Sequence, residues 1–526
     1  MNLIIMKKIK AIIFIALTGL FWTSCSNENF EDLFKDPNRT ENAPATLIFN
    51  GVLNDMYEGC WNSTTRFCQF WALNYNYYGN QEYNWTGASL NFISLKNVLK
   101  MEEEAQLSGA DAANPYSALG KFFRAYFYYN MTNKVGDLPM TEALKNIELQ
   151  TPKYDSQKAI FVQILKWLDE ANTELGTLIA AADISLLGDI YYGNRLAAWQ
   201  KAVNVYTLRV LIALSKKEAD GDLGIKAKFA QILGNPAKYP LFSGNGDNLV
   251  YKYNSVFNKY PINPDNYGFD ALRQNLTTTH LGNLVALKDP RTFLVAEPAQ
   301  TLVESGISPT SFDAFVGASS AEDLADMTTK ANNGDYSLIN RKRYYSTYTA
   351  EDMIIVGFPE MCFNIAEAAH RGWVSADAET WYKNGILASM SFYGIQTGNL
   401  TASFLKFGGK LGEFESYTIP VDLEAYLAQS TVKYAGKNED GLKQIILQKY
   451  LAFYQNSGWE AYYNFRRTGY PAFADNGPGT GNSGKIPKRY QYPTSEINTN
   501  KSNLDAALAS QYGGKDDINA AMWLIQ

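Results

Sequence analysis

Several long segments of this chain repeat their hydrophobic residues at the period of an α-helix. In residues 158–175 the apolar positions recur every three or four residues, so they share one helix face. Asp155 and Ser156, just ahead of this run, are residue types that cap helix N-termini. The apolar face comprises Ile160, Ile164, Leu168 and Ala171. The pattern predicts an amphipathic helix and restricts the chain to folds that bury one side of such helices.

Comparable patterns occur in other segments, and several of these lie close together in pairs. Small and aromatic residues stand where two helices would touch, which is typical of tetratricopeptide-like repeats of about 34 residues. The segments are 118–139, 193–217, 359–373, 377–394 and 441–467. We therefore predict a mainly α-helical fold, in which tetratricopeptide-like helix pairs form a scaffold and there is little β structure.

Long stretches without helical periodicity separate these blocks. Their many aromatic residues argue against disorder, and irregular stretches of this length inside a folded chain are usually functional. They comprise residues 57–85, 240–270, 295–350 and 470–500. Since no clear linker divides the chain, we predict a single α-helical domain over residues 46–526, with long, irregular, aromatic-rich loops.

The N-terminus has the features of an export signal. Three lysines within residues 7–10 precede an apolar run over residues 11–22, which is too short to span a bilayer. The residues before Cys25 resemble a lipobox, in which the cysteine is acylated, as with palmitate, and becomes the mature N-terminus. We predict a lipoprotein signal peptide over residues 1–24, lipidation of Cys25 and an acylated tether over residues 25–45. A plain secretory leader is the alternative.

Charge excludes one class of partner. The formal net charge of the 526 residues is −6, and removal of the leader lysines makes it more negative. Nucleic-acid binding needs a basic face, so we predict no nucleic-acid partner.

The cysteine content does not support a disulfide scaffold. Beyond Cys25 the chain has only Cys60, Cys68 and Cys362, which are too few for that class of exported protein. A Cys60–Cys68 disulfide is one reading of the pattern. We favour buried thiols, because cysteine packs as a small hydrophobic residue.

Catalytic motifs are weak in this sequence. Gly479, Gly484 and Lys485 have phosphate-loop spacing, but Ile486 follows where a Ser or Thr would contact Mg²⁺. The chain has only two histidines and no zinc-binding motif. We therefore predict no catalytic residue, no metal and no cofactor. A hydrolase with two catalytic carboxylates is the alternative.

Several short blocks of residues follow Cys25 in a recognisable order. They are Asp36-Pro37-Asn38, Gly136-Asp137-Leu138-Pro139, Glu142-Ala143-Leu144, Asp289-Pro290-Arg291, the run Arg466-Arg467-Thr468-Gly469-Tyr470-Pro471 and residues 488–500. In this order and spacing the chain resembles the SusD/RagB-like outer-membrane lipoproteins, and among them the SusD-like branch. The resemblance extends over nearly the whole sequence.

The resemblance implies a non-enzymatic, cell-surface nutrient-binding lipoprotein on the outer face of the outer membrane. Such proteins capture oligosaccharides and deliver them to a SusC-like TonB-dependent transporter, as part of polysaccharide utilisation. Two alternatives stay open, namely a peptide-binding member of the same system and a protein-interaction lid with little ligand binding of its own. The sequence does not identify the ligand.

Residues 57–85 are the main candidate for a carbohydrate-binding site. Sugars present apolar CH faces and a rim of hydroxyl groups, so their sites combine aromatic rings with hydrogen-bonding side chains. The resemblance implies the same region, because the corresponding loops of family members often contribute to the ligand site. The candidate residues are Trp61, Arg66, Trp71, Tyr75, Tyr77, Tyr78, Asn80, Tyr83 and Trp85.

Two further stretches are weaker candidates for ligand binding. The second stretch contains Tyr251, Tyr253, Tyr260 and Tyr267, and the third contains Arg341, Arg343, Tyr344 and Tyr345. The positive charges of the third stretch would suit an acidic sugar or a peptide carboxylate.

Overall fold

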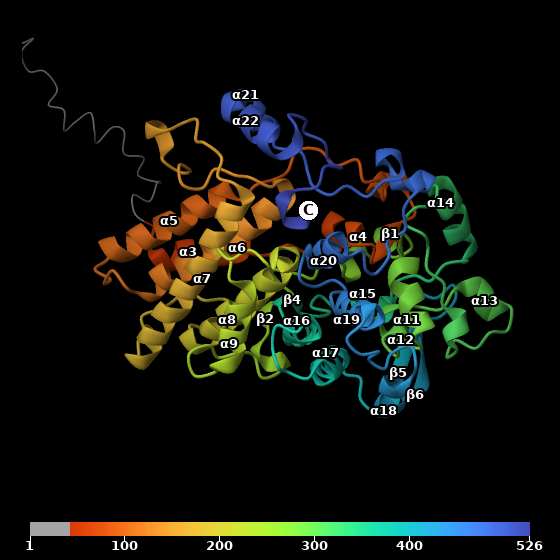
Figure 1. Cartoon of the computed structure of the whole chain (residues 1–526). Helices are drawn as coiled ribbons and strands as arrows, with labels where there is room; N and C mark the ends of the chain where they lie inside the picture. The colour runs from red at the N-terminus through yellow and green to blue at the C-terminus, as the bar shows by residue number, and fades with distance from the viewer. Residues whose placement is uncertain (1–42) are drawn as a thin grey trace, which may run out of the picture. The chain divides into compact units, whose positions relative to one another are not determined.

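Helices dominate the computed structural model, which describes residues 43–526 (Figure 1). In the first half they are α3 (Ala45–Asp55), α4 (Ser63–Phe67), α5 (Phe92–Leu107), α6 (Pro115–Val135), α7 (Gln157–Ala180), α8 (Leu196–Ala213), α9 (Ile225–Gly234) and α10 (Tyr267–Asp270). Short helices follow, namely α11 (Asn283–Ala286), α12 (Thr292–Val295), α13 (Gln300–Glu304), α14 (Leu324–Asn333) and α15 (Arg341–Tyr345). The remainder are α16 (Phe358–His370), α17 (Ala378–Phe392), α18 (Leu423–Ala428), α19 (Glu439–Ala452), α20 (Glu460–Thr468), α21 (Thr494–Thr499) and α22 (Lys501–Tyr512).

The strands of the described residues are short and pair only in twos. Each sheet is an antiparallel ribbon, which joins β1 to β3, β2 to β4 or β5 to β6. The strands are β1 (Trp71–Leu73), β2 (Leu249–Tyr251), β3 (Gln274–Leu276), β4 (Met353–Val356), β5 (Gly398–Leu405) and β6 (Phe414–Val421). The prediction of a mainly α-helical fold with little β structure is confirmed.

The N-terminal predictions cannot be compared with this structure. The signal peptide over residues 1–24, the lipidation site Cys25 and most of the tether lie outside the described residues. Residues Ala45–Gln526 form one compact unit.

Helix ends follow local capping chemistry. Ser156 caps α7, as its side chain accepts a hydrogen bond from the backbone N–H of Ala159. Within residues 118–139 we expect the helix to stop at Gly136, and α6 does end there, because the φ of 99° at Gly136 is open to glycine but strained for other residues. One prediction ran too long, because α8 ends at Ala213 before the lysines.

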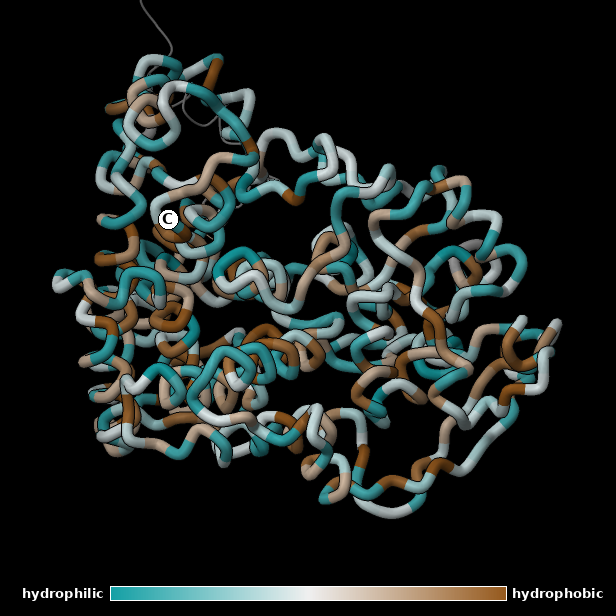
Figure 2. Tube along the Cα trace, turned by 45° about the vertical axis from the view of Figure 1, so that its right-hand side comes forward, coloured by the Kyte–Doolittle hydropathy of each residue, from teal (hydrophilic) through white to brown (hydrophobic). Residues whose placement is uncertain are grey.

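The long helices pack in sequence order as neighbours. Helices α3, α5, α6, α7 and α8 contact one another successively, and α16, α17 and α19 form a second group that α8 joins to the first (Figure 1). This is the arrangement predicted for tetratricopeptide-like helix pairs. Hydrophobic and hydrophilic positions are interspersed along the trace (Figure 2). Among the described helices, none is both long enough and apolar enough to cross a bilayer.

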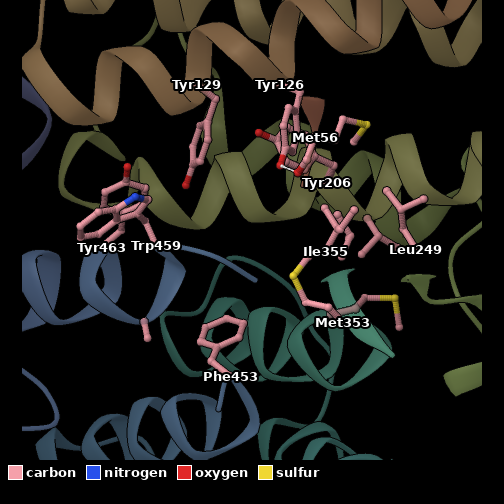
Figure 3. Packing of buried hydrophobic residues seen from close by; sticks show 14 of the residues in the cluster. Met56, Tyr126, Tyr129, Tyr206, Leu249, Met353, Ile355, Phe453, Trp459 and Tyr463 are labelled. Carbon is pink, nitrogen blue, oxygen red and sulfur yellow. Dashed lines mark hydrogen bonds between the residues drawn. The ribbon is translucent and has the colours of Figure 1, made fainter. Parts of the chain in front are cut away.

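Aromatic rings fill the junction between the two helix groups. Tyr126 and Tyr129 extend from α6 towards Tyr206 of α8 (Figure 3), with ring centroids 5.5 and 5.7 Å from that ring. On the far side, the ring of Tyr463 in α20 lies 6.4 Å from Tyr129. The Tyr126 hydroxyl donates to the carbonyl of Met56 at 2.9 Å. The Tyr129 hydroxyl donates to Glu460 at 2.9 Å, so these two tyrosines of α6 add large apolar area while satisfying their polar group.

Buried ion pairs connect the same helices. Glu360 of α16 accepts two hydrogen bonds from Arg209 of α8, at 2.7 and 2.5 Å. Two turns further along α16, Glu367 accepts two hydrogen bonds from Arg467 of α20, at 2.5 and 2.8 Å. Arg371 adds a third donor to Glu367 at 2.9 Å. Since burial of a charge carries a free-energy cost that close pairing offsets, these contacts set how α8, α16 and α20 align.

The charges of this network shift the pKa values of its members. Burial alone would raise the pKa of Glu367, but Arg467 and Arg371 hold it well below its usual range. Burial lowers the pKa of Lys449 to about 8, although its ammonium donates to Asn364 and Asn464. Burial also raises the pKa of Glu460 to about 7. The junction therefore contains groups that titrate near neutral pH.

Residues that carry the family resemblance serve this scaffold. The Asp137 carboxylate accepts a hydrogen bond from the backbone N–H of Gln157 at 2.7 Å, which fixes the start of α7. Asp289 and Arg291 form a fully buried ion pair at 2.7 Å. Arg467 belongs to the network already described. Arg291 also donates to Ser389 of α17 and to Gln448 of α19, both at 2.8 Å, so these residues hold helices together.

Removal of one partner of the Arg209–Glu360 pair tests the network. We expect Arg209→Met to lower the apparent free energy of unfolding by about 3–5 kcal/mol, because it leaves the Glu360 carboxylate buried and unpaired. The double variant Arg209→Met/Glu360→Met should recover most of this loss. Urea unfolding of the three proteins measures both effects. Equal destabilisation of the single and double variants would contradict the role given to the pair.

The raised pKa of Glu460 leads to a separate prediction about how the stability of the protein depends on pH. Its raised pKa means that the folded protein binds a proton between about pH 4.5 and 7 that the unfolded chain has released. The wild type therefore gains stability from this group as the pH falls through 7, and loses it as the pH rises. Glu460→Gln is neutral at every pH, so its melting temperature relative to wild type should rise from about pH 5 to about pH 8. Glu148→Gln, at an exposed glutamate, should show no such trend.

Candidate functional site

The stretch over residues 57–85 folds into a short helix, a strand and a closed loop. Helix α4 begins after Asn62, whose side chain accepts a hydrogen bond from the backbone N–H of Thr65. Trp61 and Gln69, on either side of α4, have positive φ angles of 58° and 54°. Such backbone is costly for residues other than glycine, and it persists where the surroundings hold it. This segment is therefore held in place by contacts from elsewhere in the fold.

Contacts from α19 and the turn after it supply that support. The backbone N–H of Trp61 donates to the side chain of Gln455 at 2.8 Å. The Tyr450 hydroxyl lies 3.0 and 2.9 Å from the carbonyls of Cys68 and Gln69. The side chain of Gln69 donates to the carbonyl of Ala474 at 2.8 Å. The scaffold thus fixes both ends of α4.

The cysteines in this stretch are free thiols. Cys60 and Cys68 are both buried, as is Cys362, which confirms the preference for thiols over a disulfide. Burial raises the pKa of Cys60 to about 12, even though the thiol lies 3.4 Å from the Tyr253 hydroxyl. These thiols pack as small apolar groups.

Two tryptophans form the floor of an opening beside α4. Trp61 and Trp71 are only 8% and 3% exposed. The indole N–H of Trp61 donates to the Tyr260 hydroxyl at 2.8 Å, and that of Trp71 donates to Thr65 at 2.9 Å. Their rings lie 6.0 Å apart. Because both polar groups are satisfied, the rings are held as rigid apolar surfaces.

A closed loop carries three tyrosines to the rim of this opening. The side-chain amide of Gln81 forms two 2.9 Å hydrogen bonds with the backbone N–H and carbonyl of Leu73, which close the loop at its base. Tyr77 is 83% exposed and Tyr75 is 44% exposed. Their rings lie 5.2 and 6.2 Å from the ring of the half-buried Tyr78. The loop therefore presents aromatic faces to solvent without losing its shape.

Strand pairing brings in residues from far along the sequence. Strand β1 pairs with β3, so that Leu73 lies opposite Gln274. The backbone N–H of Asn74 donates to the carbonyl of Arg273 at 3.1 Å. Arg273 lies over the ring of Tyr75, 4.5 Å from its centroid. The sequence analysis did not include Arg273 and Gln274 among the candidates, since a three-residue strand has no pattern that reveals its partner.

These elements enclose a cavity of about 310 Å³, here called the tryptophan cavity. Its volume falls within the range of small-molecule sites. It unites four of the predicted residues with others that the sequence did not single out. The lining comprises Trp61, Asn62, Ser63, Arg66, Trp71, Leu73, Tyr78, Pro261, Ile262, Arg273 and Gln274.

Three other predicted residues of the stretch, Asn80, Tyr83 and Trp85, lie away from this cavity. Tyr83 is buried, and its hydroxyl donates to the carbonyl of Phe67 at 2.9 Å. Trp85 is buried and stacks on Tyr490 with ring centroids 4.2 Å apart. Asn80 accepts a hydrogen bond from the backbone N–H of Glu82 at 3.1 Å. In this structure these three residues stabilise the segment and do not line the opening.

The second stretch of tyrosines serves mainly as packing. Tyr253 and Tyr260 are buried, with ring centroids 5.0 Å apart. The half-buried Tyr251 stacks on Tyr57 at 4.3 Å. Only Tyr267 of this set lines a cavity, which is separate from the tryptophan cavity.

The arginines of the third stretch already have carboxylate partners. Arg341 pairs with Glu297 at 2.5 Å, and Arg343 pairs with Glu351 at 2.7 Å. Tyr344 and Tyr345 beside them are fully buried. The expectation that these charges suit an acidic ligand therefore loses its basis, because each charge is neutralised within the protein.

A larger cavity of about 570 Å³ lies between α10, α13, α14 and the β5–β6 ribbon. Its lining mixes aromatic residues such as Tyr336 and Tyr417 with both signs of charge. Phe407 at this cavity is half-exposed. Throughout residues 43–526, no cluster of three or more His, Cys, Asp or Glu side chains is placed to hold a metal ion.

Comparison with known families identifies the class of protein. A family model described as starch-binding and associating with the outer membrane, SusD-like, matches residues 37–493. The chain belongs to the SusD-like family. No curated protein matches this SusD-like chain.

Solved structures agree with this SusD-like assignment. A SusD homologue from Bacteroides fragilis has 29% sequence identity and a TM-score of 0.78, with 92% of this chain and 100% of that one covered. An outer membrane protein from Bacteroides vulgatus has 30% identity, the same TM-score and the same coverage. A chitin-binding SusD homologue from Flavobacterium johnsoniae, at 19% identity, has a TM-score of 0.67, with 92% of this chain and 98% of that one covered. The last of these shows a shared fold only.

Proposed function

We propose that this chain is a cell-surface lipoprotein that captures oligosaccharides and delivers them to a SusC-like TonB-dependent transporter of the outer membrane. It works without catalysis, and the domain over residues 46–526 follows a signal peptide and an acylated tether. Membership of the SusD-like family supports the binding role and the association with the outer membrane. The same membership supports the choice of transporter partner.

The observation that carries the proposal is the tryptophan cavity with its rim of tyrosines. Sugar rings offer CH faces that pack on aromatic surfaces, and hydroxyl groups that need donors and acceptors. The cavity supplies aromatic surface from Trp61, Trp71 and Tyr78 beside the amide of Gln274 and two guanidinium groups. Tyr77 extends this surface outwards into solvent, so an oligomer can contact more than one ring.

Calorimetric titration with a panel of oligosaccharides tests this binding role. We expect a dissociation constant in roughly the micromolar to millimolar range for at least one oligomer, with no release of products. Tyr77→Ala should weaken binding about tenfold, the value of one lost aromatic contact of about 1.4 kcal/mol. Because Tyr77 is 83% exposed, the melting temperature should not change.

The matched control is Phe407→Ala, which removes an exposed aromatic side chain at the larger cavity. It should leave affinity unchanged. Loss of binding in Phe407→Ala together with full binding in Tyr77→Ala would place the ligand in the larger cavity and contradict the assignment. Release of sugar fragments by the purified protein would contradict the non-catalytic role.

Lipidation of Cys25 makes an independent prediction. Each buried CH₂ of an acyl chain contributes about 0.8 kcal/mol to membrane binding, so several chains hold a protein without a spanning helix. Intact-mass spectrometry of the mature protein should show an acylated Cys25 at its N-terminus. Cys25→Ser should move the protein from the membrane to the soluble fraction. An unmodified thiol at position 25, or unchanged fractionation of the variant, would rule out the anchor.

A further inference from the structure

Among the described residues, the charged side chains that line the tryptophan cavity are all positive. Arg66 and Arg273 both line it, and the described residues that line it include no Asp or Glu. The chain as a whole has a net charge of −6. The cavity is therefore a locally positive site on a negatively charged protein, and local fields of this kind attract anions.

Arg66 differs from most of the partly or fully buried arginines of the described residues. Many of these have a carboxylate partner, as in the pairs Arg124–Glu102, Arg209–Glu360, Arg291–Asp289, Arg341–Glu297, Arg343–Glu351, Arg467–Glu367 and Arg489–Asp516. Arg66 instead lies over the rings of Phe67 and Trp71, 5.6 and 5.8 Å from their centroids. Its Nε atom is buried without a hydrogen-bond acceptor.

Partial burial of the Arg66 guanidinium without a carboxylate partner among the described residues carries a free-energy cost. Desolvation lowers the pKa of Arg66, and no carboxylate of the described residues offsets this effect. A group that stays charged in such surroundings gains from an incoming anion. The planar guanidinium is also suited to paired hydrogen bonds with carboxylate or sulfate oxygens.

Arg273 places a second charge on the same cavity. It is half-buried, it has no carboxylate partner among the described residues, and it stacks on Tyr75 at 4.5 Å. The larger cavity offers a contrast, because Arg341 and Lys406 are accompanied there by Glu297 and Glu415. Of these two cavities, the tryptophan cavity is therefore the one in which aromatic surface occurs with positive charge that no described carboxylate compensates.

We propose that the tryptophan cavity selects oligosaccharides that carry anionic groups, either uronate carboxylates or sulfate esters, with Arg66 and Arg273 as their charge partners. This inference rests on the proposed function, whose binding site it shares. The aromatic walls bind the sugar faces, and the guanidinium groups bind the anionic substituent. Specificity then arises because a neutral sugar brings no negative charge to the partly buried Arg66.

The test compares each acidic oligosaccharide with a neutralised copy of itself. Calorimetry would use oligomers of polygalacturonate and alginate, and sulfated oligomers of chondroitin and heparin. The matched ligands are the same oligomers after reduction of their carboxyl groups to alcohols and, for chondroitin and heparin, removal of their sulfate groups as well. Maltoheptaose, chitohexaose and acidic peptides complete the panel. Polygalacturonate and alginate carry carboxylates alone, whereas the sulfated oligomers carry both groups. Removal of only the sulfates, or reduction of only the carboxyl groups, of the sulfated oligomers therefore separates sulfate from carboxylate as the anionic group.

We expect at least one acidic oligomer to bind, and its neutralised copy to bind at least about tenfold more weakly, since charge-assisted hydrogen bonds are stronger than neutral ones. Arg66→Gln and Arg273→Gln should each weaken the acidic ligand about tenfold to a hundredfold. Added salt should weaken ligand binding by the wild type and have less effect on the double variant Arg66→Gln/Arg273→Gln. Arg195→Gln, at an exposed arginine outside the cavity, should behave as wild type.

If Arg66 and Arg273 had only a structural role, their variants would lose stability and keep their affinity for the ligand. Since Arg66 has no carboxylate partner in the part of the chain that the structure describes, Arg66→Gln should not lower the melting temperature. A large fall in melting temperature, with affinity unchanged in Arg273→Gln, would overturn the proposal.

The panel also separates this inference from the proposed function. Binding of a neutral oligosaccharide that both arginine variants retain would overturn the selection for anionic sugars and leave oligosaccharide capture intact. Binding of acidic peptides without any sugar would overturn both, as would a complete lack of binding across the panel.

Discussion

Buried charge pairing on α16 is the constraint on which the rest of this structure depends. Glu360 and Glu367 lie on α16 and bind Arg209 of α8 and Arg467 of α20. All four groups are almost fully buried, so each pays a large desolvation cost that only close pairing offsets. Apolar packing alone tolerates sliding of one helix on another, whereas these bidentate contacts have one good geometry. The ion pairs therefore fix the relative positions of the helices from the two groups.

The candidate site inherits its geometry from this scaffold. Helix α19 and the turn after it supply Tyr450 and Gln455, which hold the backbone at both ends of α4. Gln81 closes the tyrosine loop with two further hydrogen bonds. A site that is fixed in this way spends little conformational entropy when it binds a ligand. The exposed rings of Tyr75 and Tyr77 are thus displayed on a prearranged surface.

The motifs that reveal the family and the residues that line the cavity are different sets. Asp137, Asp289, Arg291 and Arg467 make hydrogen bonds or ion pairs that hold helices together. They identify the scaffold, and they say nothing about the ligand. Charge in the cavity comes instead from Arg66 and Arg273. These arginines are informative because neither has a carboxylate partner among the described residues. An arginine without a carboxylate partner can be recognised only when its surroundings are known.

The amino-acid sequence by itself determined the helices, because their periodicity and caps are local. The apolar face of α7, its cap at Ser156 and the stop of α6 at Gly136 all follow from neighbouring residues. The sequence also pointed to residues 57–85, where aromatic and polar side chains alternate. Only the tertiary structure decided which of these residues reach the cavity, since burial of Tyr83 and Trp85 depends on partners such as Phe67 and Tyr490. It also decided that Arg273 joins Arg66, because the pairing of two three-residue strands about 200 positions apart leaves no local signal in either segment.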